Sequence, residues 1–199
     1  SRELKTRAAD KFGRNPDHIK VMPGLSCFVA ETESEANEKY QYMQSLIHPI
    51  VAREILSTIF GGFDLSKFPF DGPLPEIPMT DGSRSTMQPA IDMARNENLS
   101  IRQVAMRIAG ARGKSVIKGT PSQVADYIQH WFEEEAADGF NVMPPFLPGG
   151  LDDFVNMVIP ELQRRGLFRT EYTGRTLRDH LGLPRPRSVF ETRADHAAE

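Results

Sequence analysis

The sequence has little of several features that define large protein classes. Cys27 is the only cysteine among 199 residues, so neither an intrachain disulfide nor a cysteine-rich metal site is available. No apolar run reaches the roughly 18–20 residues that cross a bilayer, and no charged segment followed by an apolar one opens the chain. We therefore expect a cytoplasmic protein in a reducing compartment, with no membrane association.

The chain also lacks a basic excess and the common cofactor motifs. Lys and Arg number 24 against 27 Asp and Glu, a net charge of -3, which argues against a nucleic-acid partner. The five histidines show no HExxH or related spacing, so no metal is expected. Neither GxGxxG nor a Walker loop occurs, which leaves a dinucleotide fold without support. The 39% hydrophobic and 26% charged residues that are present suit a globular core.

Hydrophobic spacing and helix-start signals predict alternating helices and strands. Three capping boxes, at 32–35, 100–103 and 120–123, each indicate the start of a helix. Continuous apolar segments are typical of strands buried on both faces. The helices expected are 2–12, 33–47, one from 101 that ends at Gly110 or Gly113, one from 121, and one from 151 that buries Phe154, Val155, Val158 and Leu162; the strands expected are 19–30, 115–119 and 140–143.

The segment 61–89 has a different composition. It holds four glycines and five prolines, a density that predicts no regular secondary structure. Three aromatic residues in it, Phe63, Phe68 and Phe70, argue against a disordered linker. We interpret 61–89 as an ordered long loop, and such loops in compact domains are usually lids or binding loops.

Strands that alternate with amphipathic helices favour βαβ units and a parallel sheet. Only three strands are predicted, whereas a complete eight-stranded (β/α) barrel takes about 250 residues. The chain starts at Ser1 rather than Met, inside a predicted helix, so we expect it to begin partway through a larger protein. Ligands in such folds gather where strands end, here at 28–31, 117–120 and 143–145.

Two candidate positions have both a chemical and a purely structural interpretation. Cys27 lies in a predicted buried strand, where a small hydrophobe is favoured over a thiolate nucleophile. Gly119-Thr120-Pro121 offers the backbone amides of a helix N-terminus to an anionic group, but the same residues make a good helix cap. Neither position by itself identifies a reaction.

Several blocks together resemble a known family. Residues 119–126 (GTPSQVAD), followed by 137–141 (ADGFN), resemble the final βαβ segment of the bacterial luciferase-like flavin monooxygenases. Within that family, the resemblance is to the nitrilotriacetate monooxygenase component A group, and it covers residues 1 to about 186. The blocks that carry this narrower resemblance are Val21–Leu25, Arg107–Gly113, Pro160–Gly166 and Thr176–Leu183.

The resemblance implies an α/β fold, the C-terminal half of a (β/α)8 TIM-type barrel. Its three strands would be the sixth to eighth, with 61–89 as an insertion loop inside the domain 1–186 and with 187–199 as a tail. The family uses reduced FMN, supplied by a separate flavin reductase, and O2 to oxidise a small organic substrate, without a metal. Most of its flavin contacts come from the first five strands.

The resemblance also implies positions for a site, although no acid, base or nucleophile is identified. The residues expected at the flavin or substrate pocket are Ile117, Lys118, Gly119, Thr120, Met143 and Pro144. The insertion supplies a substrate lid of Phe63, Phe68 and Phe70.

Three functional hypotheses follow. In the first, the chain is part of a two-component monooxygenase and is inactive without the N-terminal half of the barrel. In the second, it is a non-catalytic half-barrel that associates with a second copy through open sheet edges. In the third, which the specific blocks favour less, it is a deazaflavin-dependent oxidoreductase. The sequence does not identify a substrate under any of them.

Overall fold

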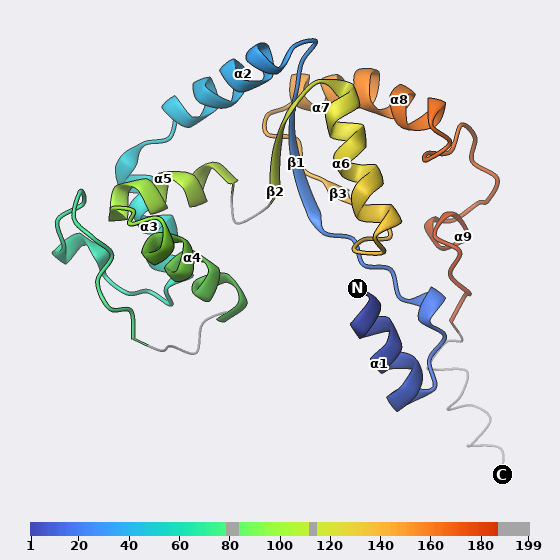
Figure 1. The fold of residues 1–199 in the computed structure, drawn as a ribbon, viewed down its shortest axis with the longest axis horizontal. Coiled ribbons are helices and arrows are strands. Elements are labelled where there is room, and N and C mark those ends of the chain that lie inside the picture. The colour runs from blue at the N-terminus through green and yellow to red at the C-terminus, as the bar shows by residue number, and fades with distance from the viewer. Residues whose placement is uncertain (79–83, 112–114, 187–199) are drawn as a thin grey trace, which may run out of the picture. The chain divides into compact units, whose positions relative to one another are not determined.

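A computed structural model describes residues 1–78, 84–111 and 115–186 (Figure 1). The helices are α1 (Arg2–Phe12), α2 (Glu33–Ser45), α3 (Pro49–Ile59), α4 (Arg84–Asn96), α5 (Ile101–Ala111), α6 (Pro121–Glu133), α7 (Gly149–Asp153), α8 (Ile159–Arg164) and α9 (Leu177–His180). The strands are β1 (Gly24–Val29), β2 (Ser115–Gly119) and β3 (Asn141–Val142), and short helical turns cover Pro16–His18, Leu65–Lys67 and Phe154–Val158. The predicted tail 187–199 and the alternative helix end at Gly113 lie outside the described residues.

The chain divides into two compact units. The first unit comprises Ser1–Pro23, Ala125–Asn141 and Ile159–Glu199, and the second comprises Gly24–Val124 and Val142–Val158. The second unit contains β1, β2 and the helices α2 to α5, whereas the first contains α1, α8 and α9.

The second unit is organised around β1. This strand pairs in parallel with β2, in a register that joins Leu25 to Ser115 and Val29 to Gly119, as the parallel-sheet prediction requires. On its other edge, the Leu25 carbonyl accepts a 2.8 Å hydrogen bond from the Met143 amide. The strand begins at Gly24 rather than at the expected residue 19, because Pro23 has no backbone N–H to contribute to a ladder.

The sheet order is β2-β1-β3, so the first strand is central. Consecutive strands of a (β/α) barrel instead pair with their sequence neighbours, which would place β2 in the centre. The described residues form a partial α/β fold. The assignment of its three strands as the sixth to eighth of a barrel stays a prediction.

A hydrophobic core of the second unit lies among α3, α4 and α5, which gather together in Figure 1. Leu56 of α3 and Phe60, which directly follows that helix, are fully buried there, as are Ile101 and Val104 from α5. Apolar residues three or four positions apart on each helix supply this shared interior. Helix α3 is absent from the sequence-based expectations, although Pro49 at its first position and the apolar spacing of Ala52, Leu56 and Ile59 are ordinary helix signals.

The structure corrects the predicted loop 61–89. A helix, α4, begins at Arg84 and contains Pro89, so the irregular segment ends earlier than expected. Proline removes one helical hydrogen bond, but Met87, Ala90, Ile91 and Ala94 are buried on one face of α4. Burial of that face compensates for the lost hydrogen bond, so the density of prolines does not by itself exclude a helix here. Residues 79–83 of the predicted loop lie outside the described part of the chain.

The local start signals are confirmed. The Thr32 hydroxyl accepts from the Glu35 amide while the Glu35 carboxylate accepts from the Thr32 amide, and both bonds of the Ser100–Gln103 and Thr120–Gln123 boxes are also formed. One predicted burial is wrong, because Val155 is 47% exposed. A π-helical turn over Phe154–Val158 widens the helix there and shifts the phase of its apolar face. Phe154, Val158 and Leu162 are buried as expected.

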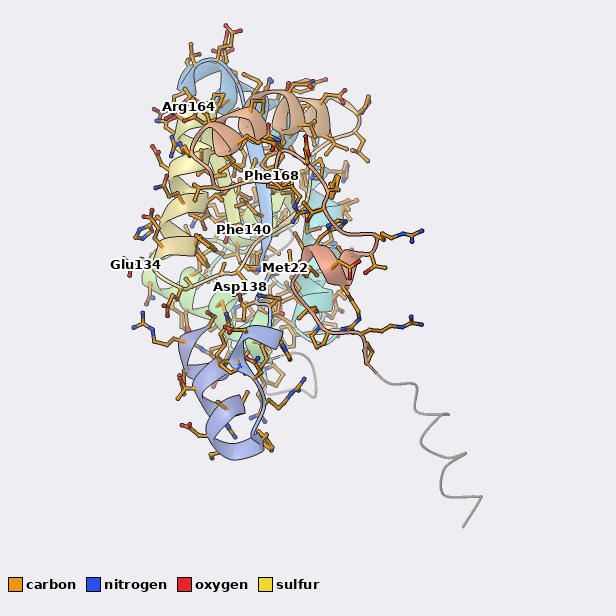
Figure 2. All side chains as sticks on the ribbon, turned by 90° about the vertical axis from the view of Figure 1, so that its right-hand side faces the viewer. Met22, Glu134, Asp138, Phe140, Arg164 and Phe168 are labelled. Carbon is orange, nitrogen blue, oxygen red and sulfur yellow. The ribbon has the colours of Figure 1, made fainter. Side chains whose placement is uncertain are left out.

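In the first unit, the segment after α6 runs beside residues 21–23. Asp138 accepts hydrogen bonds from Lys5 and, at 2.8 Å, from the Val21 amide, and its own amide donates to the Val21 carbonyl. Figure 2 shows Met22, Asp138 and Phe140 close together in this region. A Cβ added to Gly139 would lie 3.2 Å from Met22 Cε, so the segments pack tightly. Asp138 thus connects α1 to the chain segment that enters β1.

Substitution of Phe60 by Ala should lower the free energy of unfolding by about 3–5 kcal/mol, because a fully buried aromatic ring leaves a cavity. Urea unfolding followed by circular dichroism measures this change. Phe132→Ala is the matched control, since Phe132 is 54% exposed. Equal losses in the two variants would contradict the placement of the core.

The Asp138 contacts predict a pH-dependent contribution to stability. Burial raises the pKa of Asp138, but the Lys5 and Val21 hydrogen bonds and the charges of Lys5 and Lys20 outweigh burial and lower that pKa below 3.8. A carboxyl group whose pKa is lower in the folded than in the unfolded state stabilises the fold at pH values above its unfolded-state pKa. This stabilisation is lost as the pH falls through the folded-state pKa.

Asp138→Asn should therefore be less stable than the parent by about 1–3 kcal/mol at pH 7, and the difference should shrink below pH 3.8. Urea unfolding from pH 2.5 to 7, followed by the fluorescence of Trp131, the single tryptophan, measures the free energy of unfolding of the parent and of the variant. The exposed Asp10→Asn serves as control. A difference that stays constant down to pH 2.5 would disprove the assignment.

Candidate functional site

The carboxyl end of β1 is held by a lysine from α2. Lys39 Nζ donates to the Val29 carbonyl at 2.8 Å and to Asp153 Oδ2 at 2.7 Å. Both charged side chains are partly buried, with 36% and 28% of their surfaces exposed, so the contact excludes part of the surrounding water. Lys39 therefore positions the end of a buried strand against α2 and α7.

A cavity of about 470 Å³ lies in the second unit beside this strand end. This volume falls in the range of small-molecule sites, roughly 300–1,000 Å³. Its lining comes from β1, from the end of α2, from the end of α5 and from the segment after β3. The lining residues are Ser26, Phe28, Met43, Gln44, Ile47, Ala109, Gly110, Met143, Pro144, Pro145, Phe146 and Leu147.

The lining is apolar with two polar side chains. Ser26 is 9% exposed and Gln44 is half-buried, and the lining residues within the described ranges carry no charge. Gly110 allows Gln44 to lie close against α5, because a Cβ built on Gly110 would be 1.9 Å from Gln44 Nε2. Any larger residue at 110 would displace the Gln44 side chain.

The structure brings together only part of the predicted site. Met143 and Pro144, expected at the mouth after the third strand, line the cavity with Phe28, which lies at a predicted strand end. Ile117 and Gly119 belong to β2 but are not among the lining residues. Gln44 and Gly110 carry no sequence signal for a site, since they lie on helices far apart in the chain.

The turn after β2 is already occupied by the side chains of the chain itself. Gln123 Oε1 accepts from the Thr120 amide at 2.9 Å, and it would lie 2.5 Å from a Cβ added at Gly119. Lys118 donates to Asn37 Oδ1 at 3.0 Å and lies 4.5 Å above the Tyr40 ring. These contacts support the helix-cap interpretation of Gly119-Thr120-Pro121.

A flavin phosphate needs cations or unpaired amides, and the described residues around the cavity do not supply them. Among the described residues, the cavity lining has no Lys or Arg, and the Thr120 amide is capped by Gln123. Neither place in the described part of the chain therefore supplies a phosphate site. In the same described ranges, no group of three or more His, Cys, Asp and Glu side chains is arranged to hold a metal ion.

The three phenylalanines of the predicted lid pack on the core of α3, α4 and α5. Phe63 and Phe68 stack with ring centroids 5.7 Å apart, and the Arg102 guanidinium lies 4.4 Å from the Phe70 ring while it also bonds Asp71. None of these three aromatic rings lines the cavity. Their role over a substrate stays a prediction.

Comparisons with known proteins identify homologues of this chain. No family model matches the chain. It is 53% identical to nitrilotriacetate monooxygenase component A of Aminobacter aminovorans, over 94% of this chain and 41% of that protein. It is 45% identical to N-acetyl-S-(2-succino)cysteine monooxygenase of Bacillus subtilis, over 92% of this chain and 42% of that protein.

Solved structures agree with these relatives. The chain superposes on DmoA from Hyphomicrobium sulfonivorans with a TM-score of 0.74 at 26% identity, over 90% of this chain and 37% of that chain. It superposes on a riboflavin lyase, solved with modified FMN and riboflavin, with a TM-score of 0.68 at 29% identity, over 91% and 39%.

The chain is thus homologous to the luciferase-like FMN-dependent monooxygenases. Within that class, its homologues are nitrilotriacetate monooxygenase component A and related enzymes, which confirms the resemblance seen in the sequence. The chain spans about two-fifths of the length of the curated relatives it matches, 41% and 42%. Across the described residues, no helix is both long and apolar enough to cross a membrane.

Cys27 should behave as a structural thiol. It is 2% exposed, and burial raises its pKa to about 12. Iodoacetamide at pH 8 should leave the folded chain unmodified and should alkylate Cys27 fully in 8 M urea, as mass spectrometry would show. Rapid alkylation of the folded chain would favour the reactive-thiolate interpretation.

Proposed function

We propose that this chain is the C-terminal portion of a two-component flavin-dependent monooxygenase, which uses reduced FMN and O2 to oxidise a small organic substrate. The observation that carries the proposal is the 53% identity to nitrilotriacetate monooxygenase component A over 94% of the chain. An identity this high over nearly the whole chain does not arise by chance. The named relatives are enzymes, so nothing favours the alternative of a non-catalytic interaction module.

The position of the cavity supports this proposal. Phe28 lies next to the last residue of β1, and Met143 and Pro144 directly follow β3. Enzymes with parallel (β/α) folds bind their substrates at the carboxyl ends of the strands. In the proposed function, this cavity forms part of the substrate pocket, and Phe63, Phe68 and Phe70 belong to a lid in the complete enzyme.

We further propose that FMN binding needs residues beyond this chain. Among the described residues, neither the cavity lining nor the turn after β2 supplies a phosphate site, and the relatives are more than twice as long as the segment they share with this chain. An N-terminal half with the first five strands would provide the phosphate contacts, and Ile117, Lys118, Gly119 and Thr120 would approach the flavin from the other side. A separate reductase would supply reduced FMN.

A segment exchange tests the proposal. The matched segment of the Aminobacter component A is replaced by the matching residues of this chain, and the exchanged enzyme receives photoreduced FMN and air. FMN binding, followed by flavin fluorescence, should be retained, and an added organic substrate should be converted to an oxygenated product that mass spectrometry detects. The isolated chain of 199 residues should leave the fluorescence of FMN unquenched.

Two controls accompany the exchange. The unmatched segment of component A alone should neither bind FMN nor oxidise the substrate. The parent enzyme gives the reference value for FMN binding. An exchanged enzyme with parental circular dichroism that binds no FMN would overturn the proposed function. Tight binding of FMN by the isolated chain would overturn the claim that its flavin site is incomplete.

A further inference from the structure

We infer that Lys39 is a positioning residue for the proposed substrate pocket. Its ammonium group holds the carboxyl end of β1 and the end of α7 together, and both elements adjoin walls of the cavity of about 470 Å³. This role depends on the proposed function, in which the cavity is part of a substrate pocket. The contacts themselves are tested on the 199-residue chain without substrate or flavin.

The first contact joins α2 to β1. Lys39 Nζ donates to the carbonyl of Val29, the last residue of β1, at 2.8 Å. Phe28, the preceding residue, lines the cavity, and so does Met43, which lies four residues after Lys39 and therefore on the same face of α2. One hydrogen bond thus fixes, relative to each other, the strand and the helix that supply two walls of the cavity.

The second contact joins α2 to α7. Asp153 is the last residue of α7, and its Oδ2 accepts from Lys39 Nζ at 2.7 Å. The chain before α7 packs closely against that helix, since the Gly150 amide donates to the Phe146 carbonyl at 3.2 Å and a Cβ added to Gly150 would lie 3.2 Å from Pro145 Cδ. Pro145 and Phe146 line the cavity, so the position of Asp153 determines where this wall lies.

The segment 143–153 is bound at both of its ends. At its start, the Met143 amide donates to the Leu25 carbonyl of β1 at 2.8 Å, and at its end Asp153 is bound by Lys39. Loss of the second anchor lowers the free energy of local opening for the residues between the two. Lys39 therefore decides whether the cavity wall between these anchors keeps one position.

The chemistry of an ammonium group suits this double role. It carries three N–H donors and a positive charge, so it bonds a carbonyl and a carboxylate at the same time. The side chain of Asp153 is only 28% exposed, and a carboxylate that is partly removed from water is destabilised when its cation is lost. A neutral side chain of similar length, such as methionine, makes neither bond.

Deuterium uptake of the complete chain, followed peptide by peptide with mass spectrometry, tests these contacts. In Lys39→Met, the amides of 25–29 and 143–153 should take up deuterium at least about tenfold faster than in the parent. In Asp153→Asn, uptake should increase at 143–153 more than at 25–29, because the Lys39 bond to Val29 remains. Uptake across the core helices α3 and α5 should stay at the parental rate in both variants.

Two further variants serve as controls. Lys39→Arg keeps the charge and the N–H donors and should preserve the parental uptake. Lys67→Met makes the same change at a 75% exposed lysine of the same unit that pairs with Asp64 at 3.4 Å, and it should leave both segments unchanged. Circular dichroism reports whether each variant is folded, and Asp153→Asn carries the test if Lys39→Met does not fold.

A kinetic comparison in the exchanged enzyme tests the link to function. Lys39→Met should raise the KM for the oxidised substrate about fivefold or more, while the Kd for FMN stays within about twofold of the value without the substitution. Lys39→Arg should restore the KM. A merely structural role would instead lower the amount of folded enzyme and leave the KM unchanged.

Four results would overturn the inference: unchanged deuterium uptake in Lys39→Met, an equal increase across α3 and α5, uptake in Lys39→Arg as fast as in Lys39→Met, or an unchanged KM in an active exchanged enzyme. An exchanged enzyme that converts no substrate refutes the proposed function instead. The uptake at 25–29 and 143–153 then still decides whether Lys39 holds these segments.

Discussion

The need to pair the backbone of a buried strand organises the second unit. Residues 25–29 of β1 are all buried, so their amides and carbonyls have no access to water and need partners within the protein. β2 provides them along one edge, the Met143 amide reaches Leu25 on the other, and Lys39 reaches the Val29 carbonyl. These partners come from separate parts of the chain, and the need to pair the backbone groups of β1 brings them together.

The cavity is a consequence of the same arrangement. Because Met143 is bound to Leu25, the segment that follows β3 lies beside Ser26 and Phe28. Residues at the ends of α2 and α5 form the remaining walls, and the lack of a side chain at Gly110 lets Gln44 approach α5. The site therefore has apolar walls supplied by helices and a position at strand ends supplied by the sheet, a combination expected of a pocket for a small organic molecule.

The sequence predicted local elements well and longer-range consequences less well. Thr32, Ser100 and Thr120 begin helices as expected, because a capping bond depends on residues only three positions apart. Pro89 was misleading because tertiary burial of one face of α4 outweighs one missing hydrogen bond. Val155 was misplaced because the π-helical turn that shifts its face leaves no pattern in apolar spacing. Met143 and Pro144 line the cavity at a strand end that the sequence indicates, and their role in a site stays a prediction, whereas Gln44 lies on a helix with no such signal.

The sequence by itself predicted the resemblance to luciferase-like monooxygenases, the parallel pairing of the first two strands and the burial of Cys27, since these depend on patterns within short segments of the chain. Only the tertiary structure decided that the phenylalanines of the predicted lid pack on a helical core, that Gln44 lies against Gly110, and that β1 is central. The physical reason is that each of these features is a competition between partners. The partner that satisfies a backbone group or covers an apolar ring is selected by packing across the fold, which residue order alone does not specify.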